Sequence, residues 1–288
     1  MFNRRTTGSV VCPGCGALVG VRDSACYMCG RANPGLFGFG PLLRKLGADF
    51  GFVPMVIGAS SLLYVLSLLL SGSSIFEVNG LFSILSPNTP ALFLFGASGA
   101  IPVFRFGRWW TVLSASWLHG SLLHIVFNMY YVRMFGPAAA DLFGPARTVI
   151  IYVVAGAAGF LLSSFAGAYM GWMPLPMLRG AGFTVGASAP IFGLLGAMVH
   201  YGHIGSSSVK QAALQYAIPF FLFGLIMPGV DNYAHLGGFA GGYLASAFLN
   251  PMTRERGDHT VIALMCLGAT FVAIVASILS GMPLFLRS

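Results

Sequence analysis

The chain has 288 residues, of which 57% are hydrophobic and only 8% are charged, and its net charge is +8. Soluble domains contain about 25% charged residues, so this composition excludes an ordinary soluble protein and predicts a polytopic membrane protein. A positive net charge is also compatible with nucleic-acid binding, but we interpret it as a sign of membrane topology and expect no nucleic-acid partner.

The first 50 residues differ from the rest, because they hold four of the five cysteines and no long apolar run. These form two C-x-x-C pairs separated by ten residues, Cys12 with Cys15 and Cys26 with Cys29. Paired thiolates at this spacing can surround a tetrahedral ion, which favours a structural Zn²⁺ in a head that resembles a small zinc ribbon. Disulfides are disfavoured if the head is cytosolic, and iron stays an alternative. We expect the head over residues 1–35 and a linker over 36–51, and a protein partner for the head stays open.

A transmembrane helix needs roughly 20 apolar residues, and seven stretches of the chain come close to that length. We predict spans near 52–71, 117–135, 148–170, 188–204, 211–228, 233–250 and 260–281. The fourth and sixth are short or rich in glycine. The predicted fold is therefore an all-α membrane protein, with a core of six transmembrane helices over residues 52–250. Residues 251–288 are expected to form a loop and one further transmembrane helix.

The distribution of basic residues predicts how the spans are oriented. With the N-terminus inside, eleven of the fifteen Lys and Arg residues fall on the inner side and four on the outer side. The positive-inside bias therefore favours a cytoplasmic N-terminus and an external C-terminus. The segment 72–116 is too long for a simple connection and ends in an aromatic and basic stretch, 104–110. Because Trp and Arg favour the headgroup level, we expect this stretch at the outer interface.

Two polar residues of the second predicted span share one helix face. His124 and Asn128 are four residues apart, so on a helix they lie one turn apart. Both can donate hydrogen bonds toward a common point, as a developing oxyanion requires. Hydrogen bonding between helices is the alternative role, and these two residues alone do not distinguish the two. We interpret His119, one turn earlier, as structural.

A serine and a histidine in two later spans form a candidate nucleophile and base. Ser188 follows two small residues, although a serine there is by itself more simply a helix N-cap. A free serine is a weak nucleophile and needs an adjacent base, which His235 could supply. Gly238 and Gly242 follow His235 on the same helix face, and such a G-x-x-x-G pair lets helix backbones approach closely. An ionisable side chain in an apolar span is costly, which makes His235 a functional candidate.

Together these motifs resemble those of the rhomboid family of intramembrane serine proteases. That family is recognised by H-x-x-x-x-H-x-x-x-N, G-x-S-G and A-H-x-x-G-x-x-x-G in separate helices. The chain matches them in order with His119, His124 and Asn128, with Gly186 and Ser188, and with Ala234, His235, Gly238 and Gly242. The resemblance implies Ser188 as nucleophile and His235 as general base. It implies Asn128, His124 and the Ser188 backbone N–H as the oxyanion hole, and Phe192 against the catalytic histidine.

The chain departs from the family pattern at two places. Ala189 stands where the family has a glycine and is followed by Pro190, which could narrow the site or alter the oxyanion hole. In the long first loop Thr111 follows Trp110, where the family often has Trp-Arg. Neither departure removes a catalytic side chain. The seventh span resembles the 6+1 arrangement found in part of the family.

The activity that the resemblance implies is cleavage of transmembrane segments of other membrane proteins, with no cofactor for catalysis. The protein is then expected to be a multi-pass protein of a bacterial inner membrane, in contact with the lipid bilayer. Asp231 lies four residues before His235, and we expect it to face water. A catalytically weak or inactive rhomboid-like protein that captures transmembrane helices is the alternative. A transporter ranks last, because the spans show few charges and no inverted repeat.

Overall fold

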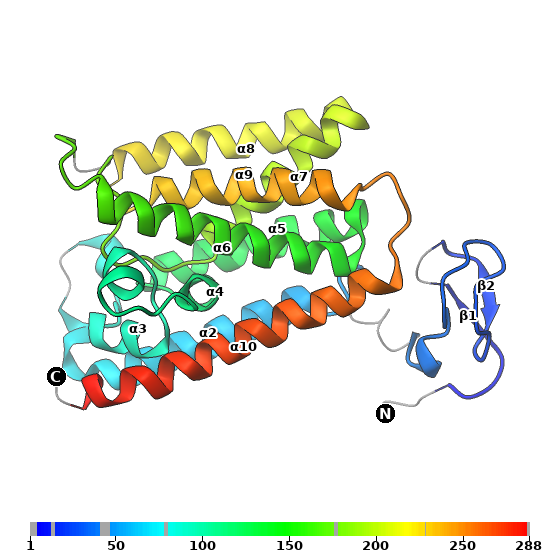
Figure 1. Cartoon of the computed structure of the whole chain (residues 1–288), viewed down its shortest axis with the longest axis horizontal. Helices are drawn as coiled ribbons and strands as arrows, with labels where there is room; N and C mark the ends of the chain where they lie inside the picture. The colour runs from blue at the N-terminus through cyan, green and yellow to red at the C-terminus, as the bar shows by residue number, and fades with distance from the viewer. Residues whose placement is uncertain are drawn as a thin grey trace.

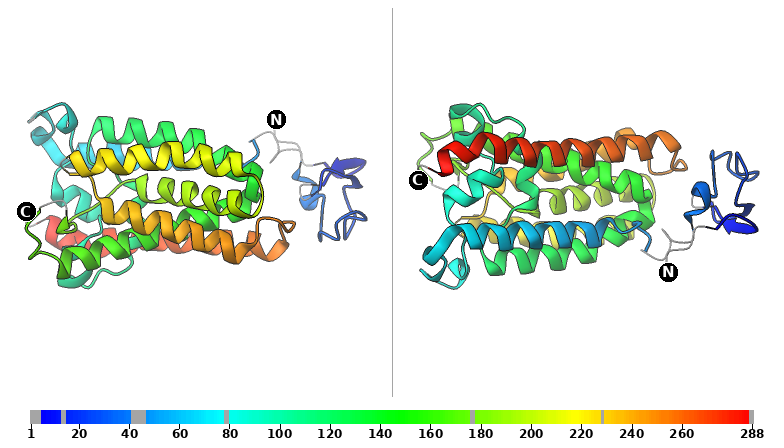
Figure 2. Two further views of the ribbon diagram at one scale, coloured as in Figure 1. Left: turned by 90° about the horizontal axis from the view of Figure 1, so that it is seen from above. Right: turned by 90° about the horizontal axis from the view of Figure 1, so that it is seen from below.

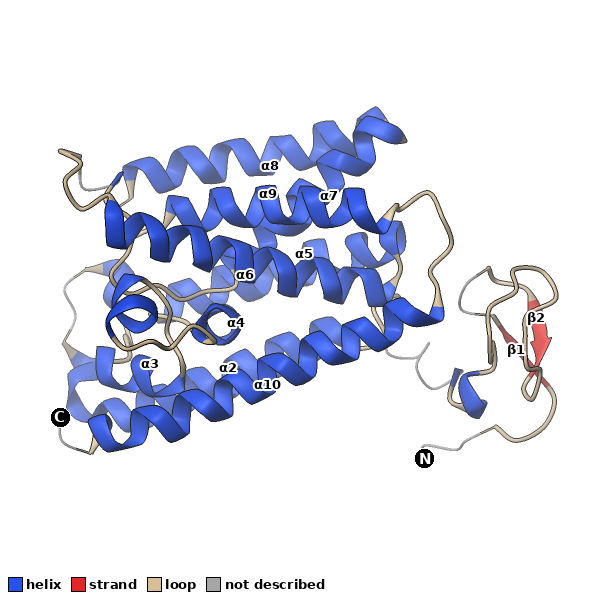
Figure 3. Cartoon of the chain, viewed as in Figure 1, coloured by secondary structure: helices blue, strands red, loops and turns tan. Residues whose placement is uncertain are grey.

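The computed structural model describes residues 5–12, 15–40, 47–77, 80–175, 178–227 and 229–286. The chain forms a bundle of helices and, at one end of it, a small head that contains the two strands of the described residues (Figure 1, Figure 3). Residues 41–46 of the expected linker lie outside the described residues.

The elements are as follows in chain order. The head contains β1 (Ser9–Val11) and β2 (Leu18–Gly20), and the short helix η1 (Leu36–Gly38) follows it at the start of the linker. The long helices are α2 (Phe52–Ser71), α5 (Leu122–Phe143), α6 (Pro145–Tyr169), α7 (Ser188–Ile204), α8 (Ser207–Ile226), α9 (Asn232–Leu249) and α10 (Gly257–Phe285). Between α2 and α5 lie η2 (Gly72–Phe76), η3 (Leu81–Ser83), α3 (Thr89–Phe95), η4 (Ile101–Arg105), α4 (Thr111–Ser114) and η5 (Ala115–Trp117).

Every predicted span overlaps one long helix, and α2 and α7 have the predicted bounds. Within the described residues, four helices are long and apolar enough to cross a membrane: Phe52–Phe76, Pro145–Tyr169, Ser207–Ile226 and Gly257–Phe285. The protein is therefore a multi-pass membrane protein. The two views of Figure 2 show the long helices running side by side, with the head beyond one end of the bundle.

The predicted bounds of the second span are wrong at both ends. Helix α5 begins at Leu122, because the Ser121 hydroxyl accepts the His124 N–H at 3.3 Å and caps the helix. It continues to Phe143. His119 therefore precedes α5 instead of lying one turn earlier on it.

Glycines bring α6, α7 and α9 together at the centre of the bundle. A Cβ atom at Gly242 of α9 would collide with the Gly193 carbonyl of α7, and one at Gly238 would collide with the Ala189 carbonyl. Gly159 of α6 lies in the same way against the backbone of α9. This confirms the close approach predicted from the G-x-x-x-G pair. It also places the first turn of α7 beside the start of α9.

The segment between α2 and α5 packs against α10. Arg108 is only 3% exposed, and it donates to the carbonyls of Phe93 (2.8 Å) and of Ser277 in α10 (2.6 Å). The Trp110 indole N–H donates to Ser277 Oγ at 3.1 Å. The prediction of a headgroup position is therefore wrong for Arg108, although Trp109 is exposed. A buried guanidinium needs hydrogen-bond acceptors, and these two carbonyls supply them.

The head consists of an antiparallel hairpin, β1 with β2, and two cysteine turns. Gly16 and Gly30 follow the C-x-x-C pairs, with φ of 77° and 70°, a conformation that glycine adopts readily. Their N–H groups donate to the carbonyls of Cys12 (2.9 Å) and Cys26 (2.8 Å). Each pair of cysteines is thereby folded into a tight turn.

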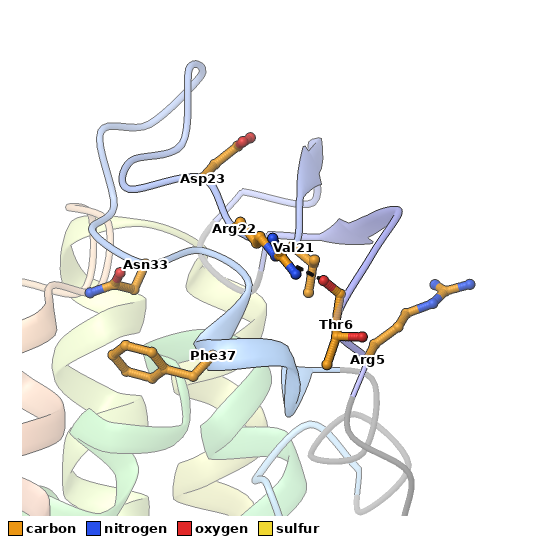
Figure 4. A pocket seen from close by; sticks show the side chains of 7 residues that line it. All are labelled: Arg5, Thr6, Val21, Arg22, Asp23, Asn33 and Phe37. Carbon is orange, nitrogen blue, oxygen red and sulfur yellow. Dashed lines mark hydrogen bonds between the residues drawn. The ribbon is translucent and has the colours of Figure 1, made fainter.

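A shallow pocket of about 200 Å³ lies on the head (Figure 4). Its lining residues are Arg5, Thr6, Val21, Arg22, Asp23, Asn33 and Phe37. Arg22 Nε donates to the Thr6 carbonyl at 3.0 Å, as the dashed line in Figure 4 shows, and Arg5 donates to the Ser9 carbonyl at 3.0 Å. Both arginines therefore make hydrogen bonds within the head.

Arg108→Ala is expected to lower the free energy of unfolding by roughly 2–4 kcal/mol, because two hydrogen bonds from a buried charged group are lost. Arg105→Ala is the matched control, since that residue is exposed at the end of η4. Thermal unfolding in detergent measures both variants. Equal melting temperatures for the two would contradict the role assigned to the contact with α10.

Candidate active site

Ser188 is the first residue of α7, and its side chain does not cap the helix. The N-cap residue is Ala187, which makes no side-chain hydrogen bond to the first turn. The simple N-cap role considered for Ser188 is therefore wrong. The N–H groups of a first helical turn have no partner within the helix and carry the positive end of the helix dipole. Ser188 thus lies, half-buried, where a negative charge would be stabilised.

Gly186 places the serine beside His124 of α5. Its φ of 131° is unfavourable for other residues. A Cβ atom at Gly186 would lie 2.6 Å from His124 Nε2 and 3.7 Å from Ser188 Oγ. Any side chain at this position would thus fill the space between the histidine and the serine, which explains the glycine in G-x-S.

His124 is oriented by the backbone of Gly120, four residues before it. Its Nδ1 accepts the Gly120 N–H at 3.3 Å. In a neutral imidazole the other nitrogen, Nε2, then carries the proton. This donor lies next to Gly186, on the side where Ser188 Oγ is found.

His119 has the structural role that the sequence indicated, and the structure shows which residues it contacts. It is fully buried, and its Nε2 accepts the Ala187 N–H at 3.4 Å. Its ring also packs edge-on against His124, with centroids 5.2 Å apart. His119 therefore joins the turn before Ser188 to the start of α5. The only sequence signal for this was the five-residue spacing of the two histidines.

Asn128 lies one turn after His124 on α5, as predicted, and is 5% exposed. Its Nδ2 donates to the His124 carbonyl at 2.8 Å. An amide nitrogen carries two protons, so this bond orients the side chain and leaves one donor for another acceptor.

His235 is 7% exposed and lies in the first turn of α9. The Phe192 ring of α7 stacks on its imidazole, with centroids 4.2 Å apart and planes 16° apart. Phe192 lies one helical turn after Ser188 on the same face, so this contact brings His235 to the serine's side of α7. In the described part of the chain His235 Nδ1 has no hydrogen-bond partner, and no hydrogen bond joins Ser188 to His235.

Asp231 is partly exposed, and it is the N-cap residue of α9 instead of the loop residue facing water that the sequence suggested. Its carboxylate accepts the Ala234 N–H at 3.0 Å and so caps α9 one turn before His235. The other carboxylate oxygen accepts a hydrogen bond from Ser163 of α6. Asp231 thus holds the start of α9 against α6 and orients His235 only indirectly.

The departure from the family pattern at Ala189 and Pro190 is accommodated by small residues. Ala189 is fully buried, and its methyl group fills the space left by the absent side chain of Gly159 on α6. Pro190 is the third residue of α7, where its missing N–H removes no hydrogen bond within the helix. Gly156 of α6 leaves room for the proline ring. Neither residue occupies the space between Ser188 and His124.

The four head cysteines form a separate cluster, at the other end of the molecule. Their sulfur atoms all lie within 4.8 Å of one another. Cys12 and Cys29 sulfurs are 3.7 Å apart, and those of Cys15 and Cys26 are 3.6 Å apart. Disulfide sulfurs are about 2.05 Å apart, so neither pair is a disulfide. Four sulfurs at about 2.3 Å from a tetrahedral zinc ion would be ~3.8 Å apart, so the cluster fits a metal ion.

Residues 106–252 match the Rhomboid domain, about half of the chain. This range contains the three motifs and every residue of the site described above. The chain belongs to the rhomboid family. The prediction made from the motifs is therefore confirmed at the level of the family, and the small cysteine head precedes the rhomboid domain.

Several relatives share this domain. RHOMBOID-like protein 4 of Arabidopsis thaliana is 33% identical over 166 residues, which are 56% of this chain and 39% of that protein. RHOMBOID-like protein 7 of the same plant is 29% identical over 187 residues, 63% of this chain and 56% of that protein. Rhomboid protease GluP of Bacillus subtilis is 30% identical over 177 residues, 60% and 31% of the two chains. The chain thus spans between about a third and just over half of these relatives.

Asp231→Ala is expected to lower the free energy of unfolding by roughly 1–2 kcal/mol, because α9 loses its N-cap and its bond from Ser163. Asp231→Asn keeps an N-cap acceptor and should recover most of this loss. The measurement is thermal unfolding in detergent. If both variants were as stable as the wild type, the assigned cap and interhelical bond would be wrong.

Proposed function

We propose that this rhomboid protein is an intramembrane serine endopeptidase that cleaves transmembrane segments of other membrane proteins. The observation that carries the proposal is the convergence of three helix starts on one point. Ser188 at the N-terminus of α7 lies beside His124 of α5 across Gly186, and Phe192, one turn after Ser188, stacks on His235 at the start of α9. The identity of about 30% to a protein described as a rhomboid protease supports it.

In the proposed mechanism, Ser188 Oγ attacks the substrate carbonyl carbon while His235 takes the hydroxyl proton. The imidazolium then gives this proton to the leaving amine, which leaves an acyl-enzyme on Ser188. Water then attacks the ester carbonyl carbon while His235 takes one of its protons. The bond between this carbon and Ser188 Oγ breaks, His235 returns the proton to Oγ, and the acyl group leaves as a carboxylic acid. The absence of a Ser188–His235 hydrogen bond is compatible with this role, because such bonds often tighten only when substrate is bound.

The negative oxygen of the tetrahedral intermediate would be stabilised by three donors. These are the Ser188 backbone N–H at the start of α7, the free Asn128 Nδ2 proton and His124 Nε2–H. Donors that are already oriented cost no reorganisation during the reaction. Here Gly120 orients His124, and the His124 carbonyl orients Asn128.

We place this site in a core of six transmembrane helices, residues 52–250, followed by α10 as an added seventh span. Helices α5, α7 and α9 are not among the four that are long and apolar enough to cross a membrane by themselves. This fits helices that surround a polar site, since polar groups inside a membrane must face protein or water. In this arrangement residues 1–35 form the cytoplasmic head, and the site opens toward the outside. We assign the protein to a bacterial inner membrane.

A second candidate function is capture of transmembrane helices without cleavage. It is favoured by one observation, the lack of a hydrogen bond between Ser188 and His235 in the described residues. This function predicts that membrane proteins co-purify with the chain to the same extent in wild type, Ser188→Ala and His235→Ala.

Labelling with a fluorophosphonate probe tests the proposed protease. We expect the detergent-purified wild type to be labelled, and Ser188→Ala and His235→Ala to lose labelling, because the nucleophile or its base is gone. Asn128→Ala should reduce the labelling rate by ~10²–10³-fold if its amide stabilises the oxyanion.

Ser164→Ala is the matched control, because this buried serine of α6 donates to the Phe160 carbonyl of its own helix. It should be labelled like the wild type. A folded wild type that takes up no probe, or a Ser188→Ala variant that is still labelled, would overturn the proposal.

For the head we propose one structural Zn²⁺ per chain, bound by Cys12, Cys15, Cys26 and Cys29. Elemental analysis of the purified full-length protein is expected to give about one zinc per chain. Cys12→Ser and Cys29→Ser should each lower this content, while Cys266→Ser in α10 should not. If the protein contained iron instead of zinc, the metal site would stand but its assignment to zinc would be wrong. A protein without metal would contradict both the site and the ion.

A further inference from the structure

The head contacts the bundle through the loop 250–256, which joins α9 to α10. Arg254 Nη1 donates to the Met28 carbonyl of the head at 3.1 Å. Arg31 of the head and Glu255 of the loop form an ion pair at 3.9 Å. Their side chains are only 7% and 8% exposed. Two charges removed from water are costly unless each faces an opposite charge, so this pair favours the docked position of the head.

Glu255 makes a second contact, because it caps α6. Its carboxylate accepts the Arg147 N–H at 2.9 Å, one of the first-turn amides that find no partner within a helix. The N-cap residue itself is Gly144, and a Cβ there would lie 2.7 Å from a Glu255 oxygen. Burial raises the pKa of Glu255, whereas the Arg147 N–H and the Arg31 charge favour its ionised form. The head therefore supplies one of the charges that favour the ionised form of this cap.

Arg147 extends the same contact on the side of the bundle. Its guanidinium is almost fully buried and donates to the carbonyls of Asn250 (3.0 Å) and Thr253 (2.6 Å). The loop 250–256 is thus bound from two sides, by the start of α6 and by the head. Because α9 has 18 residues, this loop lies roughly 27 Å from the end of α9 that carries His235.

The residues of the head that make this contact lie in or next to the turn formed by Cys26 and Cys29. Met28 lies between Cys26 and Cys29, and the Cys26 N–H donates to the Arg31 carbonyl at 2.9 Å. The hydrophobic core of the head is small and includes cysteines themselves. Small domains of this kind obtain their folding free energy from the bound metal. Loss of the metal would therefore release the turn that presents Met28 and Arg31.

We propose that the head is a metal-dependent clamp on the end of the bundle opposite the Ser188 site. The clamp consists of Met28 and Arg31 in the head and Arg254 and Glu255 in the loop. This inference rests on the metal site proposed above. Metal binding orders the cysteine turn, the ordered turn binds the loop, and the loop in turn keeps the N-terminus of α6 capped.

Hydrogen–deuterium exchange of the full-length protein in detergent tests the clamp, with peptides covering 144–150 and 250–256 as reporters. Removing the metal with a chelator should accelerate exchange in both segments by roughly tenfold, the effect of losing a hydrogen bond to a charged group. The Arg31→Ala variant should show the same acceleration of exchange while its head still binds the metal. Chelation of this variant should then accelerate exchange little further. Arg22→Ala is the matched control, because Arg22 bonds only within the head in the described residues and should leave exchange unchanged.

Metal content measured on the same samples separates the two proposals. If the wild type binds no metal, the metal site fails, the metal dependence of the clamp is overturned, and Arg31→Ala still tests the contact itself. If metal is bound but neither chelation nor Arg31→Ala changes exchange at 250–256, the clamp is wrong while the metal site stands. Faster exchange on chelation but not in Arg31→Ala would also overturn it, since the coupling would not pass through this ion pair.

Discussion

Close packing of glycines between α7 and α9 is the constraint on which the rest of the rhomboid domain depends. Gly193 and Gly242 place the two backbones in direct contact, and Gly238 does the same at Ala189. At this separation the first turn of α7 lies beside the start of α9, so that Phe192 can stack on His235. A methyl group at either glycine of α9 would push the helices apart, and the serine and the histidine would move with them.

Around this contact, each polar group of the site is oriented by a neighbour that has no chemical role of its own. Gly120 sets the tautomer of His124, His119 receives the N–H of the residue before Ser188, and Asp231 caps the helix of His235. Such support matters in a membrane, where buried polar groups without partners are costly. The departure at Ala189 follows the same logic, because its methyl group fits against a glycine of α6.

The two ends of the bundle are secured by different means. At the end of the Ser188 site, Arg108 joins the segment between α2 and α5 to α10 through buried hydrogen bonds. At the opposite end, Glu255 and Arg147 join α6 to the loop 250–256, and the cysteine head adds to that contact. At both ends buried charged side chains make several hydrogen bonds. These hydrogen bonds link elements that are distant in the sequence.

The sequence by itself determined what depends on short spacings. Apolar runs predicted the places of the seven long helices within the described residues. The four-residue spacing put His124 and Asn128 on one face, and C-x-x-C pairs predicted the cysteine cluster. It did not predict the start of α5, the burial of Arg108, the bond between Asp231 and Ser163 or the contact of Arg31 with Glu255. Those depend on which distant segments pack together. Periodicity and spacing are local properties of a chain, whereas the partner of a buried polar group is decided only when the helices are assembled.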